Sequence, residues 1–430
     1  MHPNSMKRRR ALAALALVVG AWACPCASGA RVYTLDECIA AAMTNSTTLA
    51  RAEASLAGAR ADVMSSWSGA LPRVSAGLSR SENLSVAGGG ETTSSAASGS
   101  VSLSQTLFDG STFASISGAS HSRSASEASL DATTRAVILG VRQAYYGLLK
   151  TVQLRDVQRE ALDLAREQLR KTESLFGLGS ASRSDLLKAQ VQVAQEELAL
   201  ISAEKNAATA RAGLCYVIGI DVTTDLEAVD PPAEPSDAGM SEYLLDEAIA
   251  RRPDVRAQEE TVTAARRSLL AAKAGRWPDL ALSVQYGRSR GSLDEFFDDV
   301  SDEYSRSVSV SMSLPVFDGL ATTAGIARAK AALMSQELAL RDAKLSAASE
   351  IETARLTVEE QQSRVAAAET ALARADEDLK VSEERFRLRS ASMLELIDAR
   401  VAYSRARADL VQARYDHESA RAELKTALGL

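Results

Sequence analysis

Apolar and polar residues alternate along two stretches in the second half of the chain. The apolar positions are Leu280, Leu282, Val284 and Tyr286, then Val308, Val310, Met312 and Leu314. Serine fills most of the intervening positions, and this period of two predicts strands with one apolar and one small, polar face. A weaker version occurs at 74–78 and 101–103. We expect strands over about 72–82, 99–108, 278–288 and 304–316, joined by polar loops at 83–99 and 288–303.

Longer segments follow a helical period instead. Residues 111–175 and 320–385 predict two long helices, and 65 residues at 1.5 Å each span about 100 Å. The helix after the first of these has apolar residues at alternating spacings of four and three, beginning at Leu187. Such a stripe, rich in small residues, predicts closely packed coiled-coil helices. A further helix is expected over Leu35–Ala70, before the first strand.

Several motifs occur twice, about 210 residues apart and in the same order. The pairs are LDECIA at 35 with LDEAIA at 245, LFDG at 107 with VFDG at 316, and SASRSDLLKAQ at 180 with SASMLELIDAR at 390. The chain therefore reads as two copies of one unit of helix, two strands and long helices. We predict a first repeat over 31–220, a connector over 221–240 that contains three prolines, and a second repeat over 241–430.

The first thirty residues have the pattern of an export signal. A basic run at 7–10 precedes an apolar run at 11–23, and small residues near Ala30 suit cleavage there. Cleavage at Cys24 with a lipid attached to that cysteine is the alternative. Cys38 and Cys215 remain in either case, and their positions in helical patterns predict buried thiols rather than a disulfide framework.

Composition argues against several classes of protein. The net charge is −7, aromatics are 4% and no basic patch is interleaved with aromatic residues, so nucleic acid is not an expected partner. The three histidines lack metal-ligand spacing, and no glycine-rich phosphate loop is present. We expect neither an enzyme nor a cofactor. Beyond the signal, no run of eighteen apolar residues predicts a transmembrane helix.

Four strands in a helical chain admit two interpretations. The hairpins could form one small soluble sheet packed on helices. Alternatively, the apolar face could contact lipid and the serine face water, as in a membrane barrel. Strands of this length can cross a bilayer when tilted. A barrel would require strands from other copies of the chain, because an open sheet edge is not tolerated in lipid.

The ordered, duplicated motifs resemble the TolC-like outer membrane factor family over the whole mature chain. The matching features are the strand openings at Pro72 and Pro278, the LFDG and VFDG strand ends, the turns at Ser180 and Ser390, and the terminal ALGL. The resemblance implies an α+β membrane protein: a long periplasmic coiled-coil barrel of helices, plus four strands per chain in the twelve-stranded barrel of a homotrimer. It also implies outer-membrane lipid around the barrel and a periplasmic adaptor and inner-membrane pump as partners.

The same resemblance suggests where the pore is narrowest. Two acidic residues after the second turn, Glu395 and Asp398, match the family's rings of carboxylates at the closed entrance. Their spacing of three places both on one side of a helix. Asp185 is the matching acidic residue of the first repeat, where the family bonds across to the neighbouring hairpin.

The family's latch around this entrance is altered in the chain. Phe386 stands where well-known members have Tyr, and Ala391 where they have Arg, while Arg183, Arg387 and Arg389 are candidate substitutes. The leading functional hypothesis is a passive outer-membrane exit duct for a tripartite efflux pump or a type I secretion system. The alternative is a periplasmic coiled-coil scaffold or adaptor, lipid-anchored or free.

Overall fold

The computed structural model describes residues 31–87, 90–231, 245–291, 296, 304–388 and 390–430. The predicted signal, Cys24 and Arg389 therefore lie outside the described residues. The helices are α1 (Leu35–Asn45), α2 (Thr47–Trp67), α3 (Gly110–Gly177), α4 (Arg183–Ile218), α5 (Leu245–Arg251), α6 (Pro253–Ala274), α8 (Ala321–Arg387) and α9 (Met393–Ala427). The strands are β1 (Arg31–Tyr33), β2 (Arg73–Ala87), β3 (Gly90–Phe108), β4 (Leu226–Ala228), β5 (Asp279–Arg290) and β6 (Ser305–Ser313).

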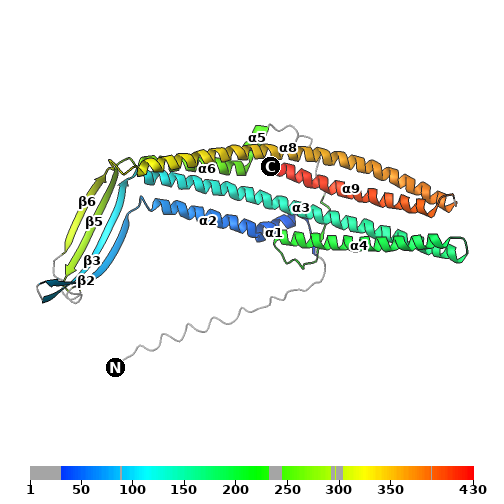
Figure 1. Ribbon diagram of the computed structural model, residues 1–430, viewed down its shortest axis with the longest axis horizontal. Coiled ribbons are helices and arrows are strands. Elements are labelled where there is room, and N and C mark those ends of the chain that lie inside the picture. Colours follow the sequence, from blue (N-terminus) through cyan, green and yellow to red (C-terminus); the bar gives the residue numbers. More distant parts are fainter. Residues whose placement is uncertain (1–30, 88–89, 232–244, 292–295, 297–303, 389) are drawn as a thin grey trace, which may run out of the picture.

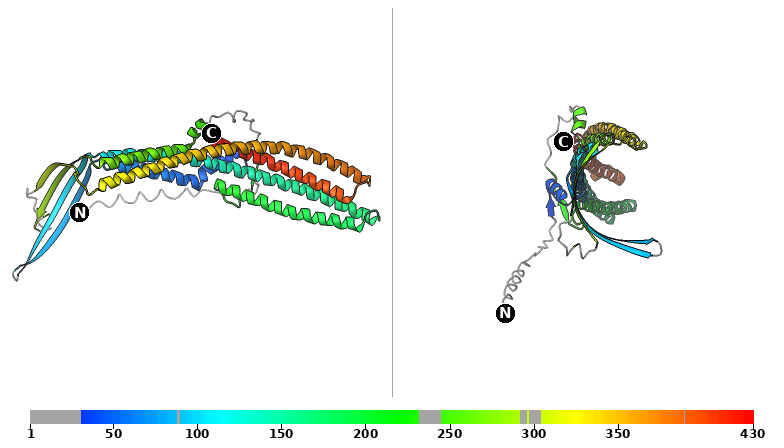
Figure 2. Two further views of the ribbon diagram at one scale, coloured as in Figure 1. Left: turned by 45° about the horizontal axis from the view of Figure 1, so that its top comes forward. Right: turned by 90° about the vertical axis from the view of Figure 1, so that its left-hand side faces the viewer.

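The molecule is elongated, with a sheet at one end and two long helical hairpins reaching the other (Figure 1). Near the sheet, neighbouring helices follow the order α2, α3, α6, α8, and toward the far end the order is α4, α3, α9, α8. Viewed end-on, these helices lie along an arc and do not close into a bundle (Figure 2). The arc therefore has two free edges, formed by α2 and α4 on one side and by α8 on the other.

The sheet has the strand order β2-β3-β5-β6, and every neighbouring pair is antiparallel. The two hairpins thus pair with each other through β3 and β5. Large apolar side chains on the sheet remain exposed, among them Val74 at 68%, Val308 at 71% and Met312 at 66%. The sheet is consequently not packed against helices, and the interpretation as a small soluble sheet covered by helices is wrong for this chain.

Several predicted element bounds need correction. The polar stretch 83–99 was expected to be a loop, but β2 continues to Ala87 and β3 begins at Gly90, because backbone pairing does not require apolar side chains. The last strand ends at Ser313, earlier than the predicted 316, where Leu314 leads into Pro315, a residue with no backbone N–H for a ladder. The expected helix Leu35–Ala70 is broken at Ser46, whose hydroxyl caps α2 by accepting from the Leu49 N–H.

The two halves present corresponding elements in the same order: two strands, a helix of 68 or 67 residues, and a helix of 36 or 35 residues. We retain the division into repeats over 31–220 and 241–430 as a proposal that these lengths support. The connector contributes β4, which pairs in parallel with β1. No sequence signal indicated this small second sheet.

One tyrosine fastens that second sheet to the helices. The Tyr145 hydroxyl, on α3, lies 3.0 Å from the carbonyl oxygen of Tyr33 and 2.6 Å from that of Val229, and it accepts from the Val229 N–H at 3.1 Å. Tyr145 is fully buried, in a core with Val141, Leu148 and both cysteines. Burial raises the pKa of the Cys38 thiol to about 11. Cys38 and Cys215 are both free and buried, so the prediction of buried thiols is confirmed.

The aspartate of the repeated FDG motif bonds to the first turn of the helix that follows it. Asp109 accepts hydrogen bonds from the backbone N–H groups of Ser111 and Thr112 at 2.9 and 3.2 Å, and Asp318 accepts from the Thr322 N–H at 2.7 Å. Asp109 is therefore the N-cap of α3, directly after β3 ends, whereas Asp318 lies two residues before Leu320, the N-cap of α8, and accepts from the first turn of that helix. Burial acts to raise the pKa of Asp109, but hydrogen bonds from Thr112 and Ser111 outweigh it and hold the pKa below its ordinary value.

Replacing this cap should destabilise the start of α3. Asp109→Ala is expected to cost about 1–2 kcal/mol at pH 7, the usual range for a lost helix cap. Because the folded-state pKa is lowered, the carboxylate's contribution is present above the unfolded pKa of about 3.9 and is lost as the pH falls through the folded value. Thermal melting of the detergent-solubilised protein should show the deficit at pH 7 and a smaller one below about pH 4. A deficit independent of pH would contradict the charged cap.

Candidate functional site

The two repeated serine motifs form the turns that end the helical hairpins. In the first, the Ser180 N–H donates to the Leu175 carbonyl at 2.8 Å, and in the second the Ser390 N–H donates to the Arg385 carbonyl at the same distance. Two residues later, Ser182 and Ser392 cap α4 and α9. Each motif therefore closes a turn with its first serine and starts the returning helix with the next, which explains its duplication.

The predicted gate residues lie at the start of α9, next to the second turn. Glu395 and Asp398 are both exposed in the single chain. The Glu395 N–H donates to the Ser392 hydroxyl at 3.2 Å, so the cap fixes this first turn of helix. The Glu395 carboxylate lies 3.8 Å from the Arg385 guanidinium at the end of α8, an exposed ion pair that contributes little energy.

Asp185 occupies the equivalent place on α4, but its carboxylate is engaged locally. It accepts from the Ser182 hydroxyl at 2.7 Å and from the Ser182 N–H at 3.4 Å, completing a capping box. In the described part of this chain Asp185 makes no hydrogen bond to the second hairpin. Its predicted role in a contact between hairpins therefore stays a prediction for the assembled protein.

The candidate latch residues are dispersed. Arg387 pairs with Glu384 of its own helix at 2.7 Å, and Phe386 is half-buried beside it. Arg183 is exposed and forms no ion pair within the described residues. The structure does not bring Arg183 and Arg387 together, so a latch built from them stays a prediction for the assembly.

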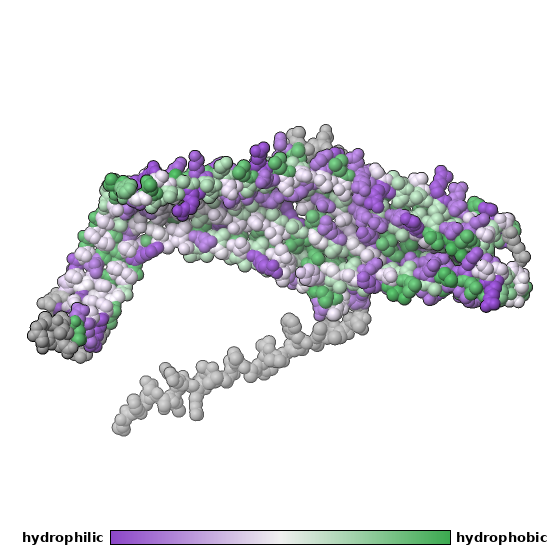
Figure 3. Space-filling model, viewed as in Figure 1, coloured by the Kyte–Doolittle hydropathy of each residue, from purple (hydrophilic) through white to green (hydrophobic). Residues whose placement is uncertain are grey.

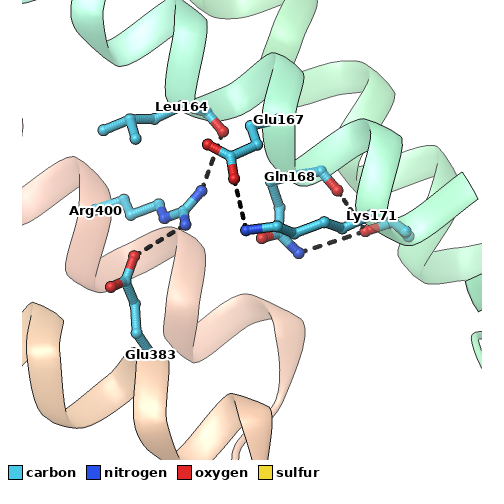
Figure 4. A network of polar contacts seen from close by, with 7 residues as sticks. Leu164, Glu167, Gln168, Lys171, Glu383 and Arg400 are labelled. Carbon is cyan, nitrogen blue, oxygen red and sulfur yellow. Dashed lines mark hydrogen bonds and ion pairs between the residues drawn. The ribbon is translucent and has the colours of Figure 1, made fainter. Parts of the chain in front are cut away.

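A different arginine links the two hairpins within the chain. Arg400, on α9, donates to the Leu164 carbonyl of α3 at 3.1 Å and to the Glu383 carboxylate of α8 at 2.9 Å (Figure 4). Only 18% of its side chain is exposed. One guanidinium thus joins three helices just above the turns, and none of the sequence patterns considered above selected it.

The surroundings of Arg400 add to this contact. Glu167, on α3, pairs with Lys171 at 2.7 Å, and this pair, with Arg400 a lesser contributor, lowers the pKa of the Glu167 carboxyl (Figure 4). The buried Gln168 amide contacts the Met393 sulfur at 3.6 Å, a further contact between α3 and α9. We call Arg400, Leu164 and Glu383 the inter-hairpin clamp.

A sequence signal for the clamp did exist. Met393, Leu396 and Ala399 are buried and mark the inward face of α9. Arg400 follows Leu396 by four residues, so a charged residue stands on an otherwise apolar helical face. Charged residues are rarely buried unless paired, and that placement predicts a partner on another helix.

The apolar edges of the arc are unpaired in one chain. The exposed residues along α4 include Leu187, Val191, Leu198 and Ile201, and those along α8 include Met334, Leu338, Leu345 and Leu356. Figure 3 shows hydrophobic surface gathered along α4 toward the turns and where the strands meet the helices. Open sheet edges at β2 and β6 lie at the other end of the molecule.

No group of three or more histidine, cysteine or acidic side chains is placed to hold a metal ion among the residues that the structure covers. Within the same residues, every helix falls short of the combined length and apolar character needed to span a bilayer.

The sequence matches one protein family and several individual proteins. A family model described as "Outer membrane efflux protein" matches residues 38–219 and 244–430. Protein CyaE of Bordetella pertussis is 30% identical over 206 residues, 47% of this chain and 43% of that protein. Outer membrane protein TolC of Vibrio cholerae is 23% identical over 370 residues, 85% of this chain and 84% of that protein.

Solved structures agree on the fold. The crystal structure of the Campylobacter jejuni CmeC outer membrane channel superposes with a TM-score of 0.84, covering 92% of this chain and 85% of that one at 18% identity. This chain spans less than half of CyaE but most of TolC and of the CmeC structure.

Proposed function

Because the chain belongs to the outer membrane efflux protein family, we propose that it serves as a passive exit duct of a tripartite efflux pump or a type I secretion system. Membership confirms the resemblance seen in the duplicated motifs, the outer-membrane location and a channel rather than an enzyme. It also confirms the fold class, in which helices form a periplasmic barrel and four strands per chain contribute to a trimeric twelve-stranded barrel.

The observation that carries the transport proposal is the two-faced sheet at the end of an open helical arc. On one face, serine hydroxyls pair across strands, as in Ser75 with Ser102 at 2.8 Å and Ser283 with Ser309 at 2.7 Å. On the other face, Val74, Val308 and Met312 are exposed. A wall that is polar inside and apolar outside suits a water-filled passage through lipid.

The finer proposal concerns partners. Because the proposed duct is passive, we further propose that a periplasmic adaptor joins it to an inner-membrane pump. The apolar edges along α4 and α8 support association of three copies side by side, since exposed apolar patches of this kind mark interaction surfaces.

The transport proposal is tested in two stages. Purified protein in planar bilayers should give discrete, long-lived channels, and the intact protein should restore resistance to a toxic compound in bacteria that retain a cognate pump and adaptor but lack their own duct. If the protein forms channels but does not restore resistance, the result would support the duct and reject the tested pump and adaptor as its partners. Protein that leaves outer membranes in a carbonate wash, and forms no channels, would instead favour the periplasmic scaffold.

A further inference from the structure

The apolar face of the sheet changes character toward the end far from the helices. Pairing places Val284 opposite Val308, and the next position on the same face places Tyr286 opposite Arg306. Arg288 follows two residues after Tyr286, so its side chain lies on this face as well. The face is therefore apolar near the helices and carries arginine and tyrosine beyond them.

Aromatic residues mark two levels along the sheet. Trp277 and Phe108, 48% and 43% exposed, lie where the strands meet the helices, and Tyr286, 46% exposed, lies nine residues beyond Trp277. The seven residues from Asp279, where β5 begins, to Tyr286 rise about 18 Å at about 3.4 Å each and a tilt of about 40°, and Trp277 lies two residues farther toward the helices. The separation of the two levels is therefore comparable with the apolar band of outer-membrane barrels, about 25 Å tall, which aromatic girdles border on both sides. Tyr286 therefore stands at the outer lipid–water boundary.

The arginines at that boundary are held by aromatic rings. The Arg306 guanidinium lies 4.3 Å from the Tyr304 ring centroid and 5.9 Å from that of Tyr286, and the two tyrosine rings stack at 5.6 Å. The Arg288 guanidinium lies 5.7 Å from the Phe296 ring. That ring sits over Gly99, where an added Cβ would come within 2.5 Å of it. Rings and glycine together fix the orientation of both guanidinium groups.

These guanidinium groups have donors to spare. The Nε and Nη2 atoms of Arg288 are buried and lack a hydrogen-bond partner among the described residues. Over the same part of the chain, Arg306 contacts aromatic rings and no carboxylate. Arg80, on β2, differs because it is paired with Glu82. Arg306 is an exposed planar cation, and beside it Arg288 keeps unpaired donors under the Phe296 ring. This pair matches a phosphate group better than an apolar ligand.

We propose that Tyr286, Arg288, Tyr304 and Arg306 form a site for the phosphate of a phosphorylated lipid headgroup in the outer leaflet. The guanidinium groups supply charge-assisted hydrogen bonds to phosphate oxygens, and the tyrosine rings contact the adjacent sugar or glycerol. This site rests on the outer-membrane location of the sheet and not on the transport role. Each chain of the trimer presents one copy.

The test measures lipid retained by the intact, detergent-extracted trimer in native mass spectrometry. With diphosphoryl lipid A as the probe, Arg288→Gln with Arg306→Gln should lower the retained lipid per trimer about tenfold, the order expected when charge-assisted contacts are lost. Arg364→Gln with Arg374→Gln is the charge-matched control on exposed α8 positions, and it should retain lipid like the wild type. Arg288→Lys with Arg306→Lys should retain an intermediate amount, since lysine keeps the charge and loses the planar fork.

Separate arms identify the ligand. Dephosphorylated lipid A should be retained poorly by wild type and variant alike. Retention that is equal in wild type and the glutamine variant would overturn the site. Complete displacement of the retained lipid A by inorganic phosphate at low millimolar concentration would also overturn the lipid site, because it would show a general anion site. Channel conductance, recorded on the same variants, should be unchanged, which separates failure of this site from failure of the duct.

Discussion

Neutralising the two carboxylates at the entrance, by Glu395→Gln with Asp398→Asn, is expected to lower the cation-to-anion permeability ratio several-fold. In a trimer we predict that the two residues form two stacked rings of three charges. Like charges about 4 Å apart repel by about 1 kcal/mol in water and about 4 kcal/mol at an effective dielectric constant of 20, so crowded rings attract cations strongly. The measurement is the reversal potential in planar bilayers under a salt gradient.

The amide substitutions are chosen because they leave the helix start intact. The Ser392 cap bonds to the backbone N–H of Glu395 and not to its carboxylate, so Glu395→Gln should not disturb α9. Glu352→Gln with Glu359→Gln removes two charges from an exposed stretch of α8 and serves as the control. A permeability ratio unaltered by the first pair, or altered equally by the second, would reject the ring assignment and leave the fold unaffected.

Removal of the clamp should have the largest effect on the closed entrance. Arg400→Met keeps much of the side-chain volume but loses the bonds to the Leu164 carbonyl and to Glu383. Hydrogen bonds to charged groups contribute about 1.5–3 kcal/mol each, and Glu383 would lose its partner. We expect the second hairpin to loosen from α3, the conductance of the closed channel to rise and the melting temperature to fall.

A neighbouring contact between the same helices provides the control. Arg407, on α9, pairs with Glu160 of α3, but its side chain is 36% exposed, twice the exposed fraction of Arg400. Arg407→Met should therefore cost less than about 1 kcal/mol and leave conductance unchanged. If Arg400→Met lowers the melting temperature without raising conductance, the clamp is structural only and plays no part in closing the entrance.

The sequence predicted more about elements than about their partners. The alternation of apolar and polar residues at Leu280–Tyr286 was sufficient to predict a strand. The FDG motif marked the strand end, where the structure shows that Asp109 caps α3. The alternation pattern missed the polar end of the first hairpin. There β2 continues to Ala87 through backbone pairing, which does not depend on apolar side chains. It also missed β1 and β4, since three-residue strands leave no periodic pattern.

For the candidate site, too, the sequence predicted local features but not contacts between helices. The position of Glu395 and Asp398 on one helical side follows from their spacing, and their exposure agrees with it. The predicted latch stays a prediction for the assembly, since within the chain Arg387 pairs with Glu384 of its own helix. Arg400 acquires its role only through Leu164 and Glu383, which are 236 and 17 residues away.

By itself, the sequence determined the duplicated plan, the two-faced strands, the long helices and the turns, because each of these depends on residues close together in the chain. The tertiary structure alone decided that the hairpins pair through β3 and β5, that Arg400 joins three helices and that aromatic rings hold Arg288 and Arg306. The physical reason is that such contacts depend on which helix or strand faces which, and local periodicity carries no information about that choice.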